Sequence, residues 1–173
     1  MTKKVLPLLV ILTSLSTLSL AQDLALKGGT VITITGGTIQ NGTVIIQKGK
    51  ITAVGPNVAV PPGVQVIDVT GTFVMPGLID SHTHIAFDGA DTNEATDPVT
   101  SQVWMKDVLV PDHETIRTTL AGGVTTVKTM HGSANVIGGV NVIIKLRYDR
   151  PVDELIVKDV RPQLKMAMGE NPK

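Results

Sequence analysis

The sequence contains no cysteine, so disulfides, thiolate metal ligands and cysteine nucleophiles are all excluded. Aromatic residues are scarce as well, with two Phe, one Trp and one Tyr among 173 residues. Basic and acidic residues balance at 15 each and form no basic block, which argues against nucleic acid as a partner. Any metal bound by this chain must therefore be held by nitrogen and oxygen ligands.

Aliphatic residues, glycine and proline dominate what is present. Hydrophobic residues make up 42% of the chain, which also has 17 Gly and 10 Pro. This composition is typical of a folded β or α/β protein whose elements are separated by tight turns.

Residues 1–21 have the features of an export signal. A basic start, MTKK, precedes the uncharged stretch VLPLLVILTSLSTLSL, and Ser19 and Ala21 occupy the small-residue positions before a cleavage site. The alternative is a membrane anchor, but the stretch contains five hydroxyl residues and a proline, and is shorter than the roughly 20 apolar residues of a membrane span. We therefore predict cleavage after Ala21, a periplasmic or secreted protein, and no stable membrane anchor.

Residues 22–75 predict a small β-domain. Three stretches rich in Val, Ile and Thr are separated by glycine-containing turns, and QKGK at 47–50 has the pattern of a hairpin turn. The prolines of residues 56–63 lack amide donors and predict a surface connection. Three or four strands form only a small sheet, which needs a partner to cover its apolar face.

Residues 76–173 change in character and predict α/β structure. LIDSHTHI (78–85) predicts a short buried strand, and a helix is expected to start at Asp112 and end at Gly122-Gly123, just before the strand 124–130. We expect a glycine-rich loop at 131–139 and a strand at 140–148. A short helix is expected at 151–160 and a last strand at 163–168. Alternating strands and helices predict parallel β/α units.

The segment VMPGLIDSHTHI, residues 74–85, carries the clearest chemical signal. Side chains two apart on a strand point to the same face, so His82 and His84 can bind one ion together. Neutral imidazole is the commonest protein ligand for zinc-like metals. The alternative is a pair of polar residues at a strand end that faces solvent.

A β-domain followed by Pro-Gly-Leu-Ile-Asp-x-His-x-His and then by LAGGVTTV (120–127) resembles the N-terminal part of the metal-dependent amidohydrolase superfamily, most of all its imidazolonepropionase- and prolidase-like branch. The resemblance implies a (β/α)₈ TIM-type barrel beside a β-sandwich, of which residues 76–173 can supply only the first part, since a whole barrel takes about 250 residues. It implies one or two divalent metals, with zinc expected. It also implies hydrolysis of amide, cyclic amide or dipeptide C–N bonds in small-molecule substrates by metal-activated water.

The resemblance also assigns roles to residues. His82 and His84 match the two metal ligands of the first barrel strand. A carboxylated lysine bridges two metals in some members, and Lys165 fits it better than Lys145 or Lys158, although a strand-end lysine with a solvent-exposed amine is an equal alternative.

The roles of three further polar residues are considered next. Asp80 is interpreted either as a carboxylate that orients a ligand histidine or as an ordinary strand-end carboxylate. His131 ends the second strand and is interpreted either as a substrate contact at the barrel mouth or as a loop histidine. His113 lies at a helix start and is expected to be exposed.

The catalytic aspartate and the other histidine ligands of the family come from later strands, expected beyond Lys173. The sequence therefore predicts the N-terminal fragment of a longer exported hydrolase, inactive by itself and open to homo-oligomer formation at full length. The alternative is a secreted binding module that keeps the fold without the chemistry.

Overall fold

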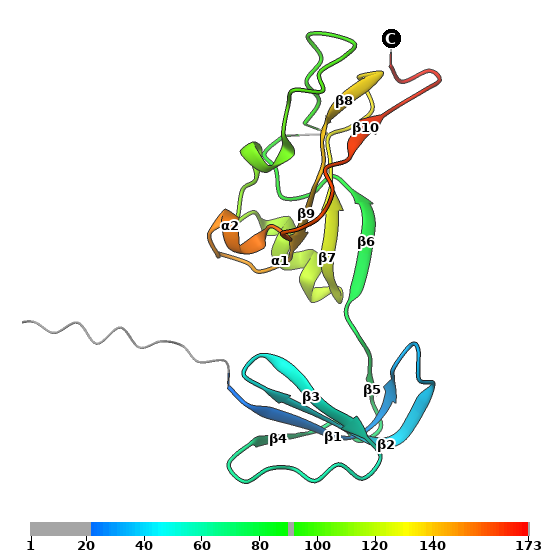
Figure 1. The fold of residues 1–173 in the computed structure, drawn as a ribbon, viewed down its shortest axis with the longest axis vertical. Coiled ribbons are helices and arrows are strands. Elements are labelled where there is room, and N and C mark those ends of the chain that lie inside the picture. Colours follow the sequence, from blue (N-terminus) through cyan, green and yellow to red (C-terminus); the bar gives the residue numbers. More distant parts are fainter. Residues whose placement is uncertain (1–21, 90–91, 173) are drawn as a thin grey trace, which may run out of the picture. The chain divides into compact units, whose positions relative to one another are not determined.

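The computed structural model of the chain describes residues 22–89 and 92–172. These residues form two compact units, one ending at Pro76 and the other beginning at Gly77 (Figure 1). The predicted export signal at 1–21 lies outside the described residues. Within them, no helix has the length and apolar character needed to cross a membrane.

The first unit is a five-stranded sheet. Its strands are β1 (Leu24–Ile32), β2 (Thr38–Gln47), β3 (Lys50–Gly55), β4 (Gln65–Asp68) and β5 (Phe73–Val74), in the order β3-β2-β1-β4, with β5 also paired to β1. The β1–β2 and β2–β3 pairs are antiparallel, whereas β4 and β5 run parallel to β1. The hairpin predicted at 47–50 is confirmed: Lys48 and Gly49 both have positive φ, as a two-residue hairpin turn requires.

This sheet exposes apolar side chains. A groove of about 260 Å³ is lined by Val31, Ile32, Thr33, Val44, Ile51, Val54, Val74, Met75 and Pro76. Ile51 keeps 65% of its surface exposed. The strands described in this unit make one sheet only, so the β-sandwich remains a prediction.

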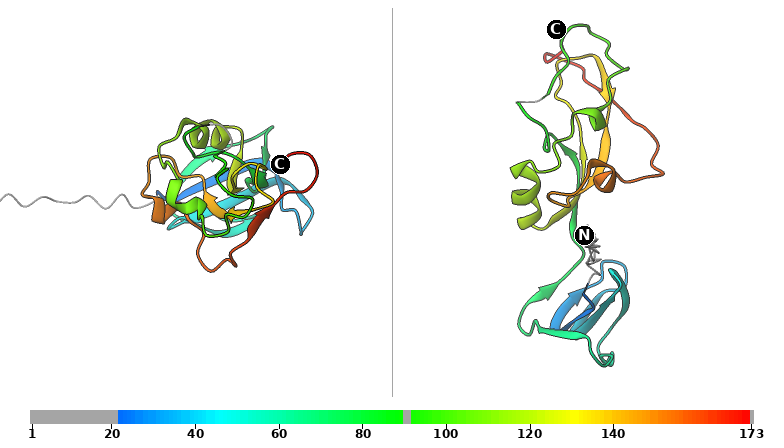
Figure 2. Two further views of the ribbon diagram at one scale, coloured as in Figure 1. Left: turned by 90° about the horizontal axis from the view of Figure 1, so that it is seen from above. Right: turned by 90° about the vertical axis from the view of Figure 1, so that its left-hand side faces the viewer.

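The second unit begins with a parallel β/α unit. The strands β6 (Leu78–Thr83) and β7 (Val124–Thr129) pair in parallel, and the helix α1 (Glu114–Ala121) lies between them in sequence. This helix packs beside the strands, as Figures 1 and 2 show. The unit also contains η1 (Met105–Val108), β8 (Ile137–Val140), β9 (Val142–Lys145), α2 (Val152–Leu155) and β10 (Leu164–Met166).

The expectation of parallel strands throughout is wrong after β7. The strand β9 pairs with β7 in the antiparallel sense, and β8 and β10 form a separate antiparallel pair. Parallel neighbours need a crossover of about a dozen or more residues, usually a helix. The stretch 130–141 contains β8 instead of a helix, so β9 returns antiparallel to β7. The prediction of a loop over 131–139 is also wrong in part, because β8 starts at Ile137.

The helix α1 begins later than expected. Its N-cap is His113, not Asp112, because the imidazole Nδ1 accepts a hydrogen bond from the amide of Thr115 (3.2 Å), as a capping carboxylate would. Capping leaves the His113 side chain only partly exposed, at 26%, whereas exposure was expected. The end of the helix is as predicted, with Gly122 as C-cap and Gly123 at a φ of 90°.

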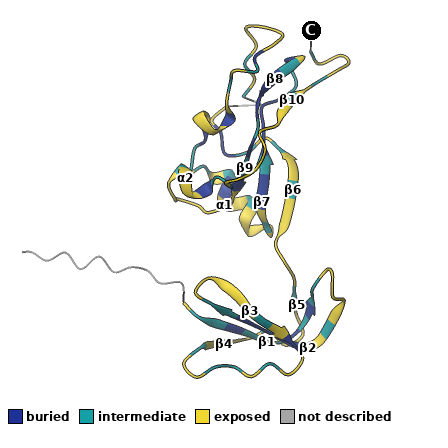
Figure 3. Cartoon of the chain, in the orientation of Figure 1, coloured by how far each residue is buried: buried dark blue, intermediate teal, exposed yellow. Residues whose placement is uncertain are grey.

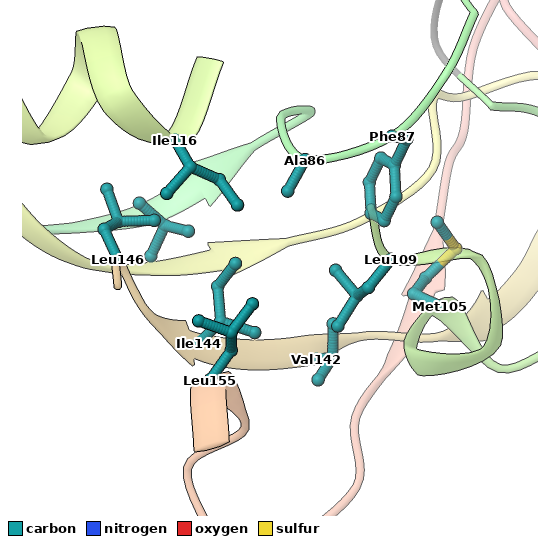
Figure 4. Packing of buried hydrophobic residues seen from close by; sticks show 10 residues of the cluster. Ala86, Phe87, Met105, Leu109, Ile116, Val142, Ile144, Leu146 and Leu155 are labelled. Atoms are coloured by element: carbon teal, nitrogen blue, oxygen red, sulfur yellow. The ribbon is translucent and has the colours of Figure 1, made fainter. Parts of the chain in front are cut away.

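The core of the second unit lies between the helices and one face of β7 and β9 (Figure 4). Its members are Ala86, Phe87, Met105, Leu109, Ile116, Val127, Val142, Ile144, Leu146 and Leu155. The strand β6 contributes none of them, so the expectation of a buried strand is wrong. Leu78 and Ile79 are 52% and 74% exposed, because no layer among the described residues covers their side chains; β6 is also an edge strand of the sheet β6-β7-β9 (Figure 3).

We expect residues 22–173, expressed by themselves, to self-associate through these uncovered apolar surfaces. Replacing Ile51 and Ile79 together by threonine should lower the associated fraction several-fold, since threonine keeps the β-branched shape that strands favour. Size-exclusion chromatography with light scattering measures this fraction. Gln65→Thr, a matched change at another exposed strand residue, should leave it unchanged. A monomeric parent chain that unfolds cooperatively would contradict the expectation.

Candidate metal site

His82 of β6 and His84, just after the end of that strand, lie side by side. Their ring centroids are 5.3 Å apart and the ring planes meet at 74°. Because alternate side chains of a strand share a face, this is the arrangement expected from the His-x-His spacing. Two imidazoles this close can present nitrogen lone pairs to one ion.

His84 has one ring nitrogen already engaged. Its Nδ1 lies 2.7 Å from the main-chain carbonyl oxygen of Met130, which follows β7 directly. A carbonyl can only accept, so Nδ1 carries the proton and Nε2 keeps its lone pair. Metal-bound histidines are commonly oriented in this way by a carbonyl or carboxylate on the second nitrogen.

Asp80 does not perform that orienting role for a ring. Its Oδ1 accepts a hydrogen bond from the main-chain amide of His82 (3.0 Å). The carboxylate therefore fixes the backbone of its own strand, which agrees with the interpretation as a strand-end carboxylate.

Lys165, on β10, is the lysine that the fold brings to the histidines. Its Nζ lies 3.3 Å from Nε2 of His82 across 83 residues of sequence. The two other candidates, Lys145 at the end of β9 and Lys158 after α2, are both exposed. The positive charge of Lys165 is the main cause that lowers the pKa of His82, followed by burial and by the neighbouring His84 and Lys128; Asp80 acts in the opposite direction. The lowered pKa favours the neutral form of His82, which is the form that binds metal.

His131, interpreted from the sequence as a substrate contact or a loop histidine, lies buried in the loop after β7. Only 3% of its surface is accessible, and burial is the main cause that lowers its pKa. Its Nε2 accepts from the amide of Gly139 (2.6 Å), and its Nδ1 donates to the carbonyl of Gly132 (2.8 Å). The sequence carried a sign of this arrangement in Gly138, whose lack of a side chain leaves space for the ring.

The nitrogen donors of His82, His84 and Lys165 could supply some of the ligands of a metal site. Among the described residues, no group of three or more His, Asp or Glu side chains converges on a point where an ion could sit. What converges is a pair of neutral imidazoles with the amine of Lys165 beside them. Zinc sites use three or four protein ligands, so a site built on this pair needs further ligands.

Comparison with known proteins identifies the family. No protein-family model matches the chain. It is 29% identical over 138 residues to the adenine deaminase of Listeria monocytogenes, covering 78% of this chain and 20% of that protein. It is 34% identical over 119 residues to the imidazolonepropionase of Idiomarina loihiensis, covering 56% and 29%. A solved amidohydrolase from Thermotoga maritima is 43% identical, with a TM-score of 0.77 over 86% of this chain and 40% of that one.

This chain belongs to the amidohydrolase superfamily. The predicted resemblance is thus confirmed, and the homologues are hydrolases that act on C–N bonds. The chain spans 20% and 29% of the two curated relatives and 40% of the solved one. The mixed α/β, strand-rich fold agrees with this superfamily, and the complete barrel remains a prediction.

Lys165 gives the site a measurable electrostatic signature. Replacing it by methionine removes the positive charge beside His82, so protonation of the ring becomes easier and the pKa of His82 should rise toward its ordinary value of 6.5. Histidine NMR signals followed against pH in the metal-free protein measure the change. Lys145→Met removes a lysine that lies outside the site, and it should leave the His82 titration where it is. A pKa of His82 that stays fixed or falls in Lys165→Met would contradict the geometry.

Proposed function

We propose that this amidohydrolase is an exported, metal-dependent enzyme that hydrolyses C–N bonds in small amides, cyclic amides or dipeptides. The single observation that carries the proposal is the His82–His84 pair, with Nδ1 of His84 bonded to the Met130 carbonyl and Nε2 free. The homologues support the reaction class, because they hydrolyse C–N bonds.

His82 and His84 would hold the ion, and zinc is the metal proposed, since neutral imidazole is a common zinc ligand. A divalent ion supplies Lewis acidity, which polarises a scissile carbonyl and lowers the pKa of water to about 7. The chain's own contribution is to keep both rings neutral and oriented. Before metal binds, while Lys165 is a positively charged amine, its charge favours neutral His82, and the Met130 carbonyl fixes the tautomer of His84.

We propose Lys165 as the residue that becomes the carboxylated lysine of a two-metal site. Its support is the 3.3 Å separation between its Nζ and Nε2 of His82, which Lys145 and Lys158 do not match. The remaining histidine ligands and the aspartate that transfers the proton are proposed to come from later strands of the whole protein. Whether one ion or two bind follows from whether Lys165 is carboxylated.

In the complete protein, the double variant His82→Ala and His84→Ala should lose its bound metal and at least about a hundred-fold in hydrolytic activity, since both first-strand ligands are gone. Elemental analysis and assays on a panel of N-acyl amino acids, dipeptides and cyclic amides measure the two effects. His113→Asn, which replaces a histidine outside the site and keeps a capping side chain, should change neither. Full metal content in the double variant would refute the assignment of ligands. Bound metal in the parent without hydrolysis of any amide would favour a binding module.

Export is proposed on the sequence of residues 1–21. The mature protein should start at Gln22, because cleavage is expected after Ala21. N-terminal analysis of the protein recovered from the periplasm or medium measures this. Replacing Ala21 by a bulky residue such as Trp should block processing and leave precursor in the cells. An intact Met1 on exported parent protein would instead indicate an uncleaved anchor.

A further inference from the structure

We propose that His131 is a positioning residue: its two main-chain bonds fix the turn after β7 so that the Met130 carbonyl stays aimed at Nδ1 of His84. The part of this inference that concerns metal rests on the proposed function, whereas the part that concerns the His84 tautomer does not.

The first support is that both ring nitrogens of His131 bond to the main chain. Nδ1 donates to the carbonyl of Gly132 at 2.8 Å, and Nε2 accepts from the amide of Gly139 at 2.6 Å. One ring therefore joins the residues just after β7 to the strand β8. A buried polar group that loses its partner costs about 1–3 kcal/mol, so these bonds resist opening.

The second support is space reserved for the ring. A Cβ placed on Gly138 would overlap Cε1 and Nε2 of His131. Any other residue at position 138 would have to displace the imidazole. The close approach of this backbone to the ring is therefore a condition of the local fold, and glycine is the residue that permits it.

The third support is the position of Met130, next in sequence to His131. The carbonyl of Met130 bonds Nδ1 of His84, and its amide donates to the carbonyl of Thr83 at 3.0 Å. Thr129 adds a hydroxyl bond to the carbonyl of Ile85 at 2.7 Å. These bonds hold the start of the turn against the end of β6, and His131 holds the residues that follow. The Met130 peptide is thus fixed on both sides.

A buried histidine in a loop commonly does no more than satisfy local groups. What distinguishes His131 is that the carbonyl it helps to fix belongs to the adjoining residue and is the one that selects the tautomer of His84. A shift of the Met130–His131 peptide would release Nδ1 of His84, and the proton could then move to Nε2, where it blocks the lone pair.

The test measures the tautomer of His84 directly. Long-range ¹H–¹⁵N spectra of the histidine rings, recorded on the complete protein without metal, should show the Nδ1-protonated form of His84 in the parent. His131→Leu removes both bonds and should give a mixture of tautomers. His131→Gln offers an amide oxygen to Gly139 and should restore most of the parent population. His113→Asn, a histidine replaced outside the network, should leave the spectrum of His84 unchanged.

Zinc affinity gives the second readout. Loss of an outer partner of a metal-bound histidine typically weakens metal binding by about 10- to 100-fold, and this loss is expected for His131→Leu and not for His131→Gln. Gly138→Ala keeps His131 but places a Cβ where its imidazole lies. The ring should be displaced and its two hydrogen bonds lost, so this variant should behave as His131→Leu does. Gly122→Ala is its control, since Gly122 has a φ of −77° and its Cβ would meet only main-chain oxygens, the nearest being that of Thr119 at 3.3 Å.

The outcomes separate the two proposals. If His131→Leu and Gly138→Ala leave the His84 tautomer and the zinc affinity as in the parent, the positioning role is wrong. It is also wrong if His131→Gln loses as much as His131→Leu, since the effect would then come from packing and not from the hydrogen bonds. If the parent binds no zinc but its His84 tautomer depends on His131, the proposed function fails and the positioning role stands. If His131→Leu does not fold, His131→Gln and Gly138→Ala decide.

Discussion

The parallel pairing of β6 with β7 is the constraint on which the candidate site depends. Parallel neighbours end at the same edge of a sheet, so the last residues of β6 and β7 are brought together. His84 comes just after β6 and Met130 just after β7, and a hydrogen bond joins the two residues at this edge. The helix α1 makes the pairing possible, because it returns the chain to the start of β7 while burying Ile116 against the core.

The site combines an electrostatic and a geometric effect. The positive charge of Lys165 disfavours protonation of His82, and the Met130 carbonyl assigns the proton of His84 to Nδ1. Both effects disfavour a proton on Nε2, by different physical means; the Nε2 of His82 is in hydrogen-bond contact with Nζ of Lys165. In the proposed metal site, ligands fixed through surrounding hydrogen bonds would need little reorganisation when an ion binds.

The sequence predicted well those features that depend on residues close together along the chain, such as turns and helix ends. The end of α1 at Gly123 and the turn at Gly49 were both recognisable, because positive φ strongly favours glycine. The burial of β6 and the direction of β9 were not predicted correctly. Burial of an apolar strand depends on which layers cover it, and direction depends on the path of residues 130–141, where β8 takes the place of a crossover helix. Neither property is encoded in the strand itself.

The sequence by itself determined that His82 and His84 share a face, because alternation along a strand is local geometry. It also determined that no thiolate could take part, because the chain has no cysteine. Only the tertiary structure decided which lysine reaches the pair, since Lys165 and His82 are 83 residues apart. It alone decided the partner of His84, a main-chain carbonyl that every residue has and no sequence pattern marks. The role of His131 was likewise hidden, because it arises from the approach of β8 to the end of β7, a contact between segments that only folding brings together.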